Sequence, residues 1–224
     1  MRATVLVLLL PLAAGCAATN PAHCTAPPAA ADPAAAMADC TCNVDGAPSV
    51  GSAPVGQQAV LPPIPLVDTR GEPVDLRRAV AAAPLTVVTF FSATCPCQRA
   101  HDQRLGDYYR EFSGRGVAFH VVDSEAGSSL ERDQQEARQR AYPFPILSDP
   151  RGTVAAAVGA HYATETLILD RQGKVRFRGG LDSDQNRARP DAHLWVRLAL
   201  VALLDGNEPA ERNPKSYGCS LRRR

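Results

Sequence analysis

The sequence has 224 residues, and its 24 Lys and Arg residues almost balance its 23 Asp and Glu residues. This length suits one domain with extensions at its ends, and the even charge excludes the broad basic surface of a nucleic-acid-binding protein. Hydrophobic residues make up 45% of the chain and charged residues 21%, so we expect a closed apolar core. Seven cysteines are the unusual feature, and their role depends on the redox compartment.

The first fifteen residues are typical of an export signal. A positive charge at Arg2 precedes the apolar stretch Ala3–Leu12, and small residues follow before Cys16. We therefore assign residues 1–15 to a signal peptide. The stretch Leu12–Cys16 resembles the bacterial lipobox, which implies that Cys16 is lipidated and anchors the protein to a cell-envelope membrane, facing the periplasm or the cell exterior. Ordinary cleavage to a soluble exported protein is the alternative.

Residues 16–55 are rich in Ala and Pro and have no sustained apolar period, which predicts a tether. Cys24, Cys40 and Cys42 lie in this segment. In an exported protein such cysteines are expected to pair with one another. A metal site at Cys40 and Cys42 is the alternative, although no second cysteine pair or histidine cluster lies near them.

The signals for regular structure begin near Leu61. Buried strands that alternate with helices predict an α/β fold with helices flanking a central mixed β-sheet, and a tight turn between the last two strands predicts an antiparallel hairpin at one edge. We assign residues 56–205 to this domain and 206–224 to a C-terminal tail that contains Cys219. The expected elements, in chain order, are two short strands within 65–76, a buried strand at 85–91, a helix at 97–112, a strand at 117–122, a helix at 129–142, a strand at 145–147, a small helix ending near 159, strands at 165–170 and 174–177, and a helix at 191–204.

The strongest chemical motif is Cys95-Pro96-Cys97, directly after the buried strand. Proline favours the first position of a helix, which would place Cys95 at the N-cap and Cys97 in the first turn. The free N–H groups and the positive end of the helix dipole favour a thiolate there, so a lowered pKa and a nucleophilic role are expected for Cys95. The alternative is a pair of purely structural cysteines.

Five segments carry a family resemblance: FFSATCPCQRAHDQRL, GRGVAFHVVDS, YPFPILSDPRGTVAAAVGA, ETLILDRQGKVRFRGGLD and the closing YGCSLR. They resemble the redoxins of the thioredoxin superfamily, the group of alkyl hydroperoxide reductases and thiol-specific antioxidant proteins, over about Leu61 to Leu221. The resemblance implies a thioredoxin-like fold. It also implies that Cys95 is the attacking cysteine and that Cys219 belongs to a terminal Gly-Cys element of similar exported proteins.

Three positions depart from the patterns of that superfamily. Only Pro96 separates the two cysteines, so a bridge between them would close a small, strained ring. Val88 stands where peroxiredoxins have a proline, although Ser92 fits their hydroxyl position. Thr164 stands where thioredoxin-like proteins place a cis-proline, so the preceding peptide bond is expected to be trans.

We therefore expect an envelope thiol-disulfide oxidoreductase that uses Cys95 as the nucleophile. Cys97 or Cys219 would resolve the intermediate, with Cys95–Cys97 as the expected working disulfide, and an envelope dithiol would supply electrons. The substrate would be a protein disulfide, or a peroxide if the protein is a thiol peroxidase. A copper-binding chaperone using Cys95, Cys97 and His161 is a further alternative. We otherwise expect no cofactor and no metal.

Overall fold

The computed structural model describes residues 53–222. The predicted signal peptide, the lipidation site Cys16, nearly all of the predicted tether and its cysteines Cys24, Cys40 and Cys42 lie outside the described residues. Within 53–222, none of the helices combines the length and the apolar character needed to cross a membrane.

A seven-stranded mixed sheet forms the centre of the molecule, in the order β2-β1-β5-β4-β3-β6-β7. The neighbours β3, β4 and β5 are parallel, and every other pair is antiparallel. All seven residues of β3 are buried, as its continuous apolar run predicts. The strands are β1 Pro65–Asp68, β2 Pro73–Asp75, β3 Leu85–Phe91, β4 Val117–Asp123, β5 Ile146–Ser148, β6 Thr166–Asp170 and β7 Val175–Gly179.

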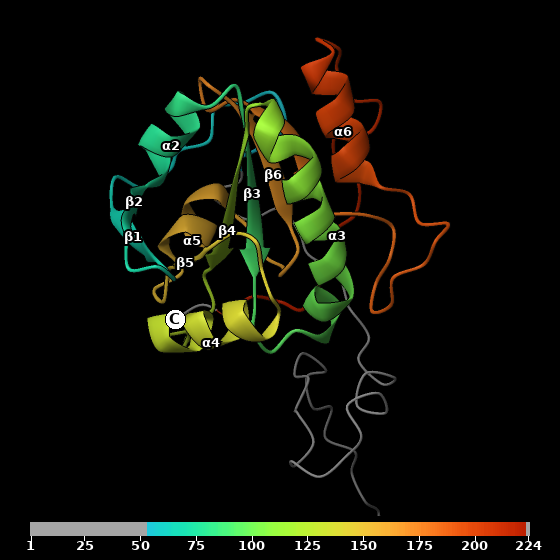
Figure 1. Ribbon diagram of the computed structural model, residues 1–224. Coiled ribbons are helices and arrows are strands. Elements are labelled where there is room, and N and C mark those ends of the chain that lie inside the picture. The colour runs from blue at the N-terminus through green and yellow to red at the C-terminus, as the bar shows by residue number, and fades with distance from the viewer. Residues whose placement is uncertain (1–52, 223–224) are drawn as a thin grey trace, which may run out of the picture.

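Helices cover both faces of this sheet (Figure 1). Buried side chains of α3 and α6 pack in one apolar cluster with one face, and those of α2 and α5 pack in a second cluster with the other face. The expected α/β architecture with a mixed sheet is therefore confirmed. The helices are α2 Leu76–Ala82, α3 Pro96–Phe112, α4 Leu130–Gln139, α5 Thr153–Val158 and α6 Trp195–Leu204, with a 3₁₀ turn η1 at Ser113–Arg115.

The helix α2 was not expected from the sequence. Asp75 caps it by accepting hydrogen bonds from the amides of Arg77 and Arg78, and its two buried residues, Leu76 and Val80, are spaced by four. An aspartate before apolar residues at this spacing is a helix-start signal. The helix has only seven residues, so its apolar spacing extends over too few positions to stand out in the sequence.

The last helix starts later than expected, at Trp195 rather than at residue 191. The residues before it bond to the preceding loop instead, because the N–H of Ser183 donates to the carbonyl of His193, and the N–H of His193 donates to the Ser183 hydroxyl. These contacts hold the segment out of helical geometry.

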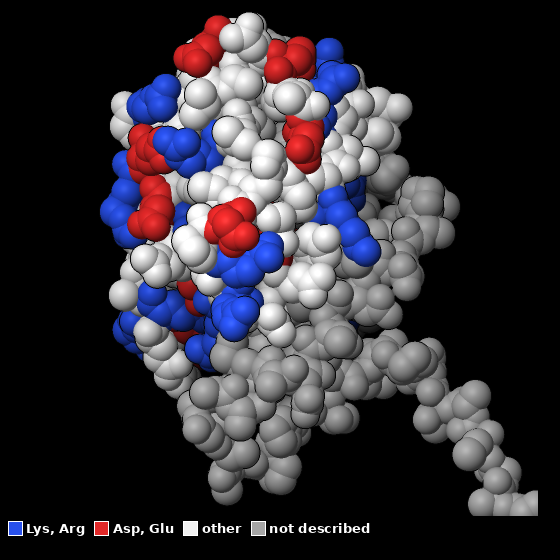
Figure 2. Space-filling view, turned by 90° about the vertical axis from the view of Figure 1, so that its right-hand side faces the viewer, with Lys and Arg blue, Asp and Glu red and all other residues white. Residues whose placement is uncertain are grey.

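Acidic and basic side chains are interspersed on the face shown in Figure 2, with no large area of one sign. This agrees with the formal net charge of +1. A mixed surface of this kind provides no strong electrostatic steering toward a polyanion.

Candidate functional site

The site is built at the point where β3 ends and α3 begins. Cys95 is the N-cap of α3, with φ −80° and ψ 115°, and Pro96 occupies the first helical position. Proline fixes the backbone angle that a helix start needs, and it disfavours helical geometry at the preceding residue. Cys95 is 1% exposed, and Cys97, in the first turn, is fully buried.

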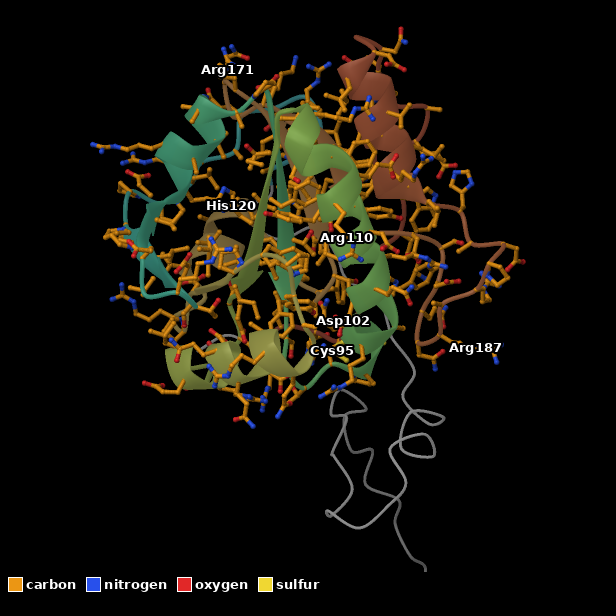
Figure 3. The ribbon with its side chains drawn as sticks, in the orientation of Figure 1. Cys95, Asp102, Arg110, His120, Arg171 and Arg187 are labelled. Atoms are coloured by element: carbon orange, nitrogen blue, oxygen red, sulfur yellow. The ribbon has the colours of Figure 1, made fainter. Side chains whose placement is uncertain are left out.

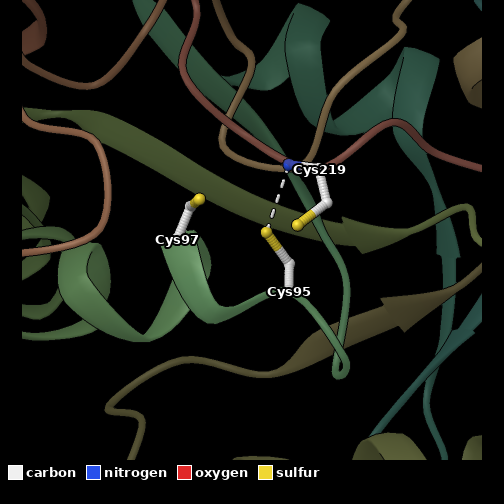
Figure 4. Close-up of side chains that lie close together, drawn as sticks. All are labelled: Cys95, Cys97 and Cys219. Carbon is white, nitrogen blue, oxygen red and sulfur yellow. Dashed lines mark hydrogen bonds between the residues drawn. The ribbon is translucent and has the colours of Figure 1, made fainter. Parts of the chain in front are cut away.

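The C-terminal tail brings a third cysteine to this point. The backbone N–H of Cys219 donates a hydrogen bond to the Sγ atom of Cys95, at 3.2 Å. Neither Cys95 nor Cys219 forms a disulfide, and their side chains face each other, with Cys97 beside them on α3 (Figure 4). The three Sγ atoms lie within 4.8 Å of one another. All three predicted catalytic residues therefore come together, although they are up to 124 positions apart in the chain.

The surroundings of Cys95 lower its pKa to about 7. The largest cause is the hydrogen bond from the Cys219 side chain; burial acts in the opposite direction, and the backbone amides of Cys219, Gln98 and Cys97 add to the lowering. Hydrogen bonds to a thiolate stabilise the charged form, whereas desolvation favours the neutral thiol. The predicted effect of the helix start is present, but a residue from the tail contributes more.

We call residues 217–222 the strap, because this segment crosses over the cysteine site. The strap lies antiparallel to residues 161–164, the loop that precedes β6, with a bridge between Tyr162 and Ser220. An extended segment that bonds to a free backbone edge is held as an added strand would be. The bonds are Ala163 N–H to Cys219 O at 2.9 Å, Leu221 N–H to His161 O at 2.7 Å and Thr164 Oγ1–H to Tyr217 O at 2.6 Å.

The sequence of the strap fits this position closely. A Cβ atom at Gly218 would lie 1.7 Å from the carbonyl oxygen of Ala163, so only glycine allows the two backbones to approach. Leu221 is 6% exposed and belongs to the apolar cluster that also contains Cys95. The ring of Tyr217 stacks on that of Trp195, with centroids 6.4 Å apart. Glycine before the cysteine and leucine two residues after it therefore anchor the strap.

The loop under the strap has no cis peptide bond, and neither does any other described residue. The trans bond expected before Thr164 is thus confirmed. Thr164 has a φ of 71°, a left-handed conformation that is rare for a β-branched residue. Its amide donates to the carbonyl of Phe90 at 2.7 Å, so this conformation ties the loop to the end of β3.

Glu125 is a buried residue whose carboxylate contacts the strap. It accepts hydrogen bonds from the hydroxyls of Ser92 and Thr94, which lie in the loop just before Cys95. Its second oxygen is 2.8 Å from Nε of Arg222 in the strap. One carboxylate therefore contacts both the loop that carries Cys95 and the segment that carries Cys219.

A second group of charges lies beneath the first turns of α3. His101 Nδ1 is 2.6 Å from the carbonyl oxygen of Cys97, and its Nε2 is 3.2 Å from Asp182. Both partners only accept hydrogen bonds, so satisfying them requires a proton on each ring nitrogen. Burial opposes this charge, but the hydrogen bond and the charge of Asp182 outweigh it and raise the pKa of His101. Arg104 pairs with the same carboxylate at 2.8 Å.

A third network holds the loop before Cys95 against α3. The Arg140 side chain is 3% exposed and pairs with Asp102 at 2.8 Å. It also donates to the carbonyl of Ala93 at 3.1 Å and lies over the ring of Phe91. Cys95 and Asp102 lie near the same end of α3, whereas His120 lies away from them along β4 (Figure 3). Burial lowers the pKa of His120 to about 4, in keeping with a structural role in the strand.

The residues that could hold a metal ion differ from those expected for a copper site. Among residues 53–222, the side chains whose ligating atoms converge are Cys95, Cys97 and Cys219, and His161 is not in this group. The backbone of His161 instead bonds to Leu221 and to the Glu165 carboxylate. Sulfur ligands suit a soft metal ion. Copper binding through His161 stays a prediction.

Comparison with known proteins gives the family. The family model described as AhpC/TSA matches residues 55–178, more than half of the chain. The chain belongs to the AhpC/TSA family. No curated protein matches it.

Solved structures similar to this chain are also known. An uncharacterized conserved protein from Geobacillus kaustophilus is 31% identical, with a TM-score of 0.70 over 80% of this chain and 98% of that one. A hypothetical protein from Sinorhizobium meliloti 1021 is 25% identical, with a TM-score of 0.70 over 77% of this chain and 96% of that one. The peroxidoxin BcpB from Mycobacterium tuberculosis is similar at 21% identity and a TM-score of 0.46, over 55% and 83% of the two chains. The fold of this AhpC/TSA protein is thioredoxin-like, as expected.

The sequence missed the polar residues that complete the site. Glu125 and Arg222 were not singled out, because single charged residues in polar segments are usually solvated. Asp182 could have been anticipated only through His101, which falls on the buried side of α3, one turn after Cys97. A histidine at such a position requires a polar partner.

Proposed function

We propose that this AhpC/TSA protein is a thiol-disulfide oxidoreductase in which Cys95 attacks and Cys219 resolves. The Cys95 thiolate forms a bond to one sulfur of a substrate disulfide, and the other substrate sulfur leaves as a thiolate. The Cys219 thiol loses its proton and attacks Cys95 Sγ, which releases the second substrate sulfur. The protein ends with a Cys95–Cys219 disulfide, and the substrate has gained two electrons.

One observation carries this proposal: the N–H of Cys219 donates to Cys95 Sγ, at 3.2 Å. The contact supports Cys95 as the nucleophile because it stabilises a thiolate. It supports Cys219 as the resolving residue because its sulfur faces the one that it must attack (Figure 4). The expectation of a working Cys95–Cys97 disulfide stays a prediction, since the hydrogen bond from the Cys97 amide supports the Cys95 thiolate but not Cys97 as the residue that attacks it.

A reductant has to return the disulfide to two thiols. We propose an envelope dithiol for this step, because the sequence predicts export and a lipid anchor at Cys16. The anchor would keep the domain near a membrane surface, where it would meet other envelope proteins. Fatty-acid labelling of the wild type and of Cys16→Ser tests this part, and equal labelling of the two would refute the anchor.

The function is tested by single substitutions at the three cysteines. Cys95→Ser should abolish reduction of a model protein disulfide such as insulin. Cys219→Ser should lower turnover by at least about 100-fold, because an external thiol must replace a neighbouring one, and Cys95 should accumulate as a mixed disulfide. Cys97→Ser is the matched control and should keep most of the turnover. Peptide mapping that finds Cys95 joined to Cys97, with Cys219 still free, would contradict the assignment.

A second candidate function is favoured by the burial of Cys95. A residue that is 1% exposed is reached more easily by a small hydroperoxide than by a protein. In that reaction the thiolate attacks the terminal peroxide oxygen, an alcohol leaves, and Cys95 becomes a sulfenic acid. Attack by Cys219 then gives the same disulfide and releases water. Peroxide consumption by the same variants separates the two functions, because only a peroxidase turns over without a disulfide substrate.

A further inference from the structure

The reaction needs two positions of the strap. In the structure the strap covers Cys95, and the N–H of Cys219 lies directly on its sulfur (Figure 4). This closed position suits the resolving step, because the two thiols face each other. A protein disulfide cannot reach a residue that is 1% exposed, so the strap has to move away before a large substrate can react.

The strap makes one described ion pair, between Arg222 and Glu125. The Arg222 side chain is 61% exposed, whereas that of Glu125 is 7% exposed. Next to this pair, the amide of Ala126 donates to the carbonyl of Arg222 at 2.8 Å. Glu125 also accepts hydrogen bonds from the hydroxyls of Ser92 and Thr94, so it remains fixed to the loop before Cys95 when the strap moves.

We propose that Glu125 and Arg222 form a latch that keeps the strap closed over Cys95 and thereby positions Cys219. Opening the strap takes the cation away from a carboxylate that stays bonded to Ser92 and Thr94, and this loss of the ion pair is unfavourable. The ion pair therefore favours the closed position. Because Arg222 is largely exposed, salt screens the pair and shifts the strap toward the open position. This inference rests on the role proposed for Cys219.

The latch is tested by the rate at which iodoacetamide alkylates Cys95 in the reduced full-length protein. Fragment-ion masses separate Cys95 from Cys97. The rate is followed over pH, where the plateau reports how often the site opens and the midpoint reports the pKa of the thiol. The titratable group that faces the Cys95 sulfur is the Cys219 thiol, and Glu125 reaches its loop through Thr94. This readout needs no substrate, so it stands whether or not the proposed turnover is found.

Arg222→Gln should raise the plateau rate about fivefold, the upper end for a solvent-exposed ion pair. The midpoint should stay near the wild-type value, because the closed position still dominates. Glu125→Gln should give a similar rise, and the double variant should add little to either single one. Added salt should raise the wild-type plateau but not that of Arg222→Gln. Arg197→Gln is the matched control, since it breaks an exposed pair with Glu111 in the last turn of α3, at the end of the helix away from Cys95.

Gly218→Ala provides a second and stronger test. Its Cβ would lie 1.7 Å from a backbone oxygen, so the strap must leave the loop. The plateau should rise about tenfold or more, and the midpoint should move up toward that of an ordinary thiol, since Cys219 is displaced. Gly114→Ala is the matched control, because its Cβ would meet nothing within 4 Å.

The outcomes are decisive in either direction. A rise for Arg222→Gln and Glu125→Gln that is absent in Arg197→Gln supports the latch. Wild-type rates in both latch variants, or an equal rise in Arg197→Gln, would overturn it. Thermal unfolding of each variant identifies a rise that comes from general loosening, which would also count against the latch.

Discussion

Two groups of buried charges flank the cysteines, and they are compensated to different degrees. Under α3, Asp182 is paired with His101, whose pKa is raised, and with Arg104. At the end of β4, Asp123 instead faces another carboxyl group, that of Asp133. The comparison teaches that burial alone does not set the behaviour of an acid: the sign of its neighbours decides whether it stays charged.

The two groups therefore depend on pH in different ways. Burial raises the pKa of Asp182, but its bonds to His101 and Arg104 outweigh burial and leave the pKa below its ordinary value of 3.8. This contribution to stability is present above pH 3.8 and is lost as the pH falls. His101 has a raised pKa, so its contribution is complete below its ordinary value of 6.5 and is lost as the pH rises. The first group thus stabilises most between pH 3.8 and 6.5.

In the pair formed by Asp123 and Asp133, both pKa values are raised. Burial, and then the charge of Asp133, raises the pKa of Asp123 to about 9. Burial raises that of Asp133 to about 6. The folded state therefore favours their protonated forms. Their contribution to stability is complete below pH 3.8 and declines as the pH rises through these two values.

The largest effect is expected for Asp182→Asn, which abolishes the compensation in the first group. It leaves His101 and Arg104 without their carboxylate, and breaking a buried ion pair costs about 3 kcal/mol of unfolding free energy. Denaturant unfolding should show the widest gap from the wild type between pH 3.8 and 6.5. A gap that does not change with pH would mean that His101 is neutral in the folded protein.

An effect of opposite sign is expected for Asp133→Asn, which relieves the second group. An asparagine amide can donate to the Asp123 carboxylate, so the folded state no longer disfavours ionisation. At pH 8 the unfolding free energy should rise by about 1–2 kcal/mol, and at pH 4 it should change little. A loss of stability at pH 8 would show that the two carboxyl groups are not in repulsive contact.

The smallest effect is expected for Arg189→Gln, at the rim of the compensated group. Arg189 pairs with Asp184 at 2.7 Å, but its side chain is 46% exposed, and exposed ion pairs contribute little. The same unfolding measurements should place this variant closer to the wild type than either variant above. A loss as large as that of Asp182→Asn would show that compensation extends to the surface.

Features set by residues that are close in the sequence could be predicted, whereas contacts between distant residues could not. The start of α3 was predicted correctly because Cys95, Pro96 and a buried strand are adjacent in the chain. The strands and their hairpin followed from local periodicity. The pairing of Arg222 with Glu125 joins residues 97 positions apart, and nothing local to either residue indicates the other. Cys219 was found only because the family resemblance pointed to it.

Thr164 has a consequence for how firmly the site is closed. A left-handed β-branched residue carries a torsional penalty of about 1–2 kcal/mol, while its hydroxyl holds the carbonyl of Tyr217. The loop that receives the strap therefore carries backbone strain in the closed position. The hydrogen bond to Tyr217 offsets part of this torsional cost, so the strap stabilises the conformation of the loop that receives it.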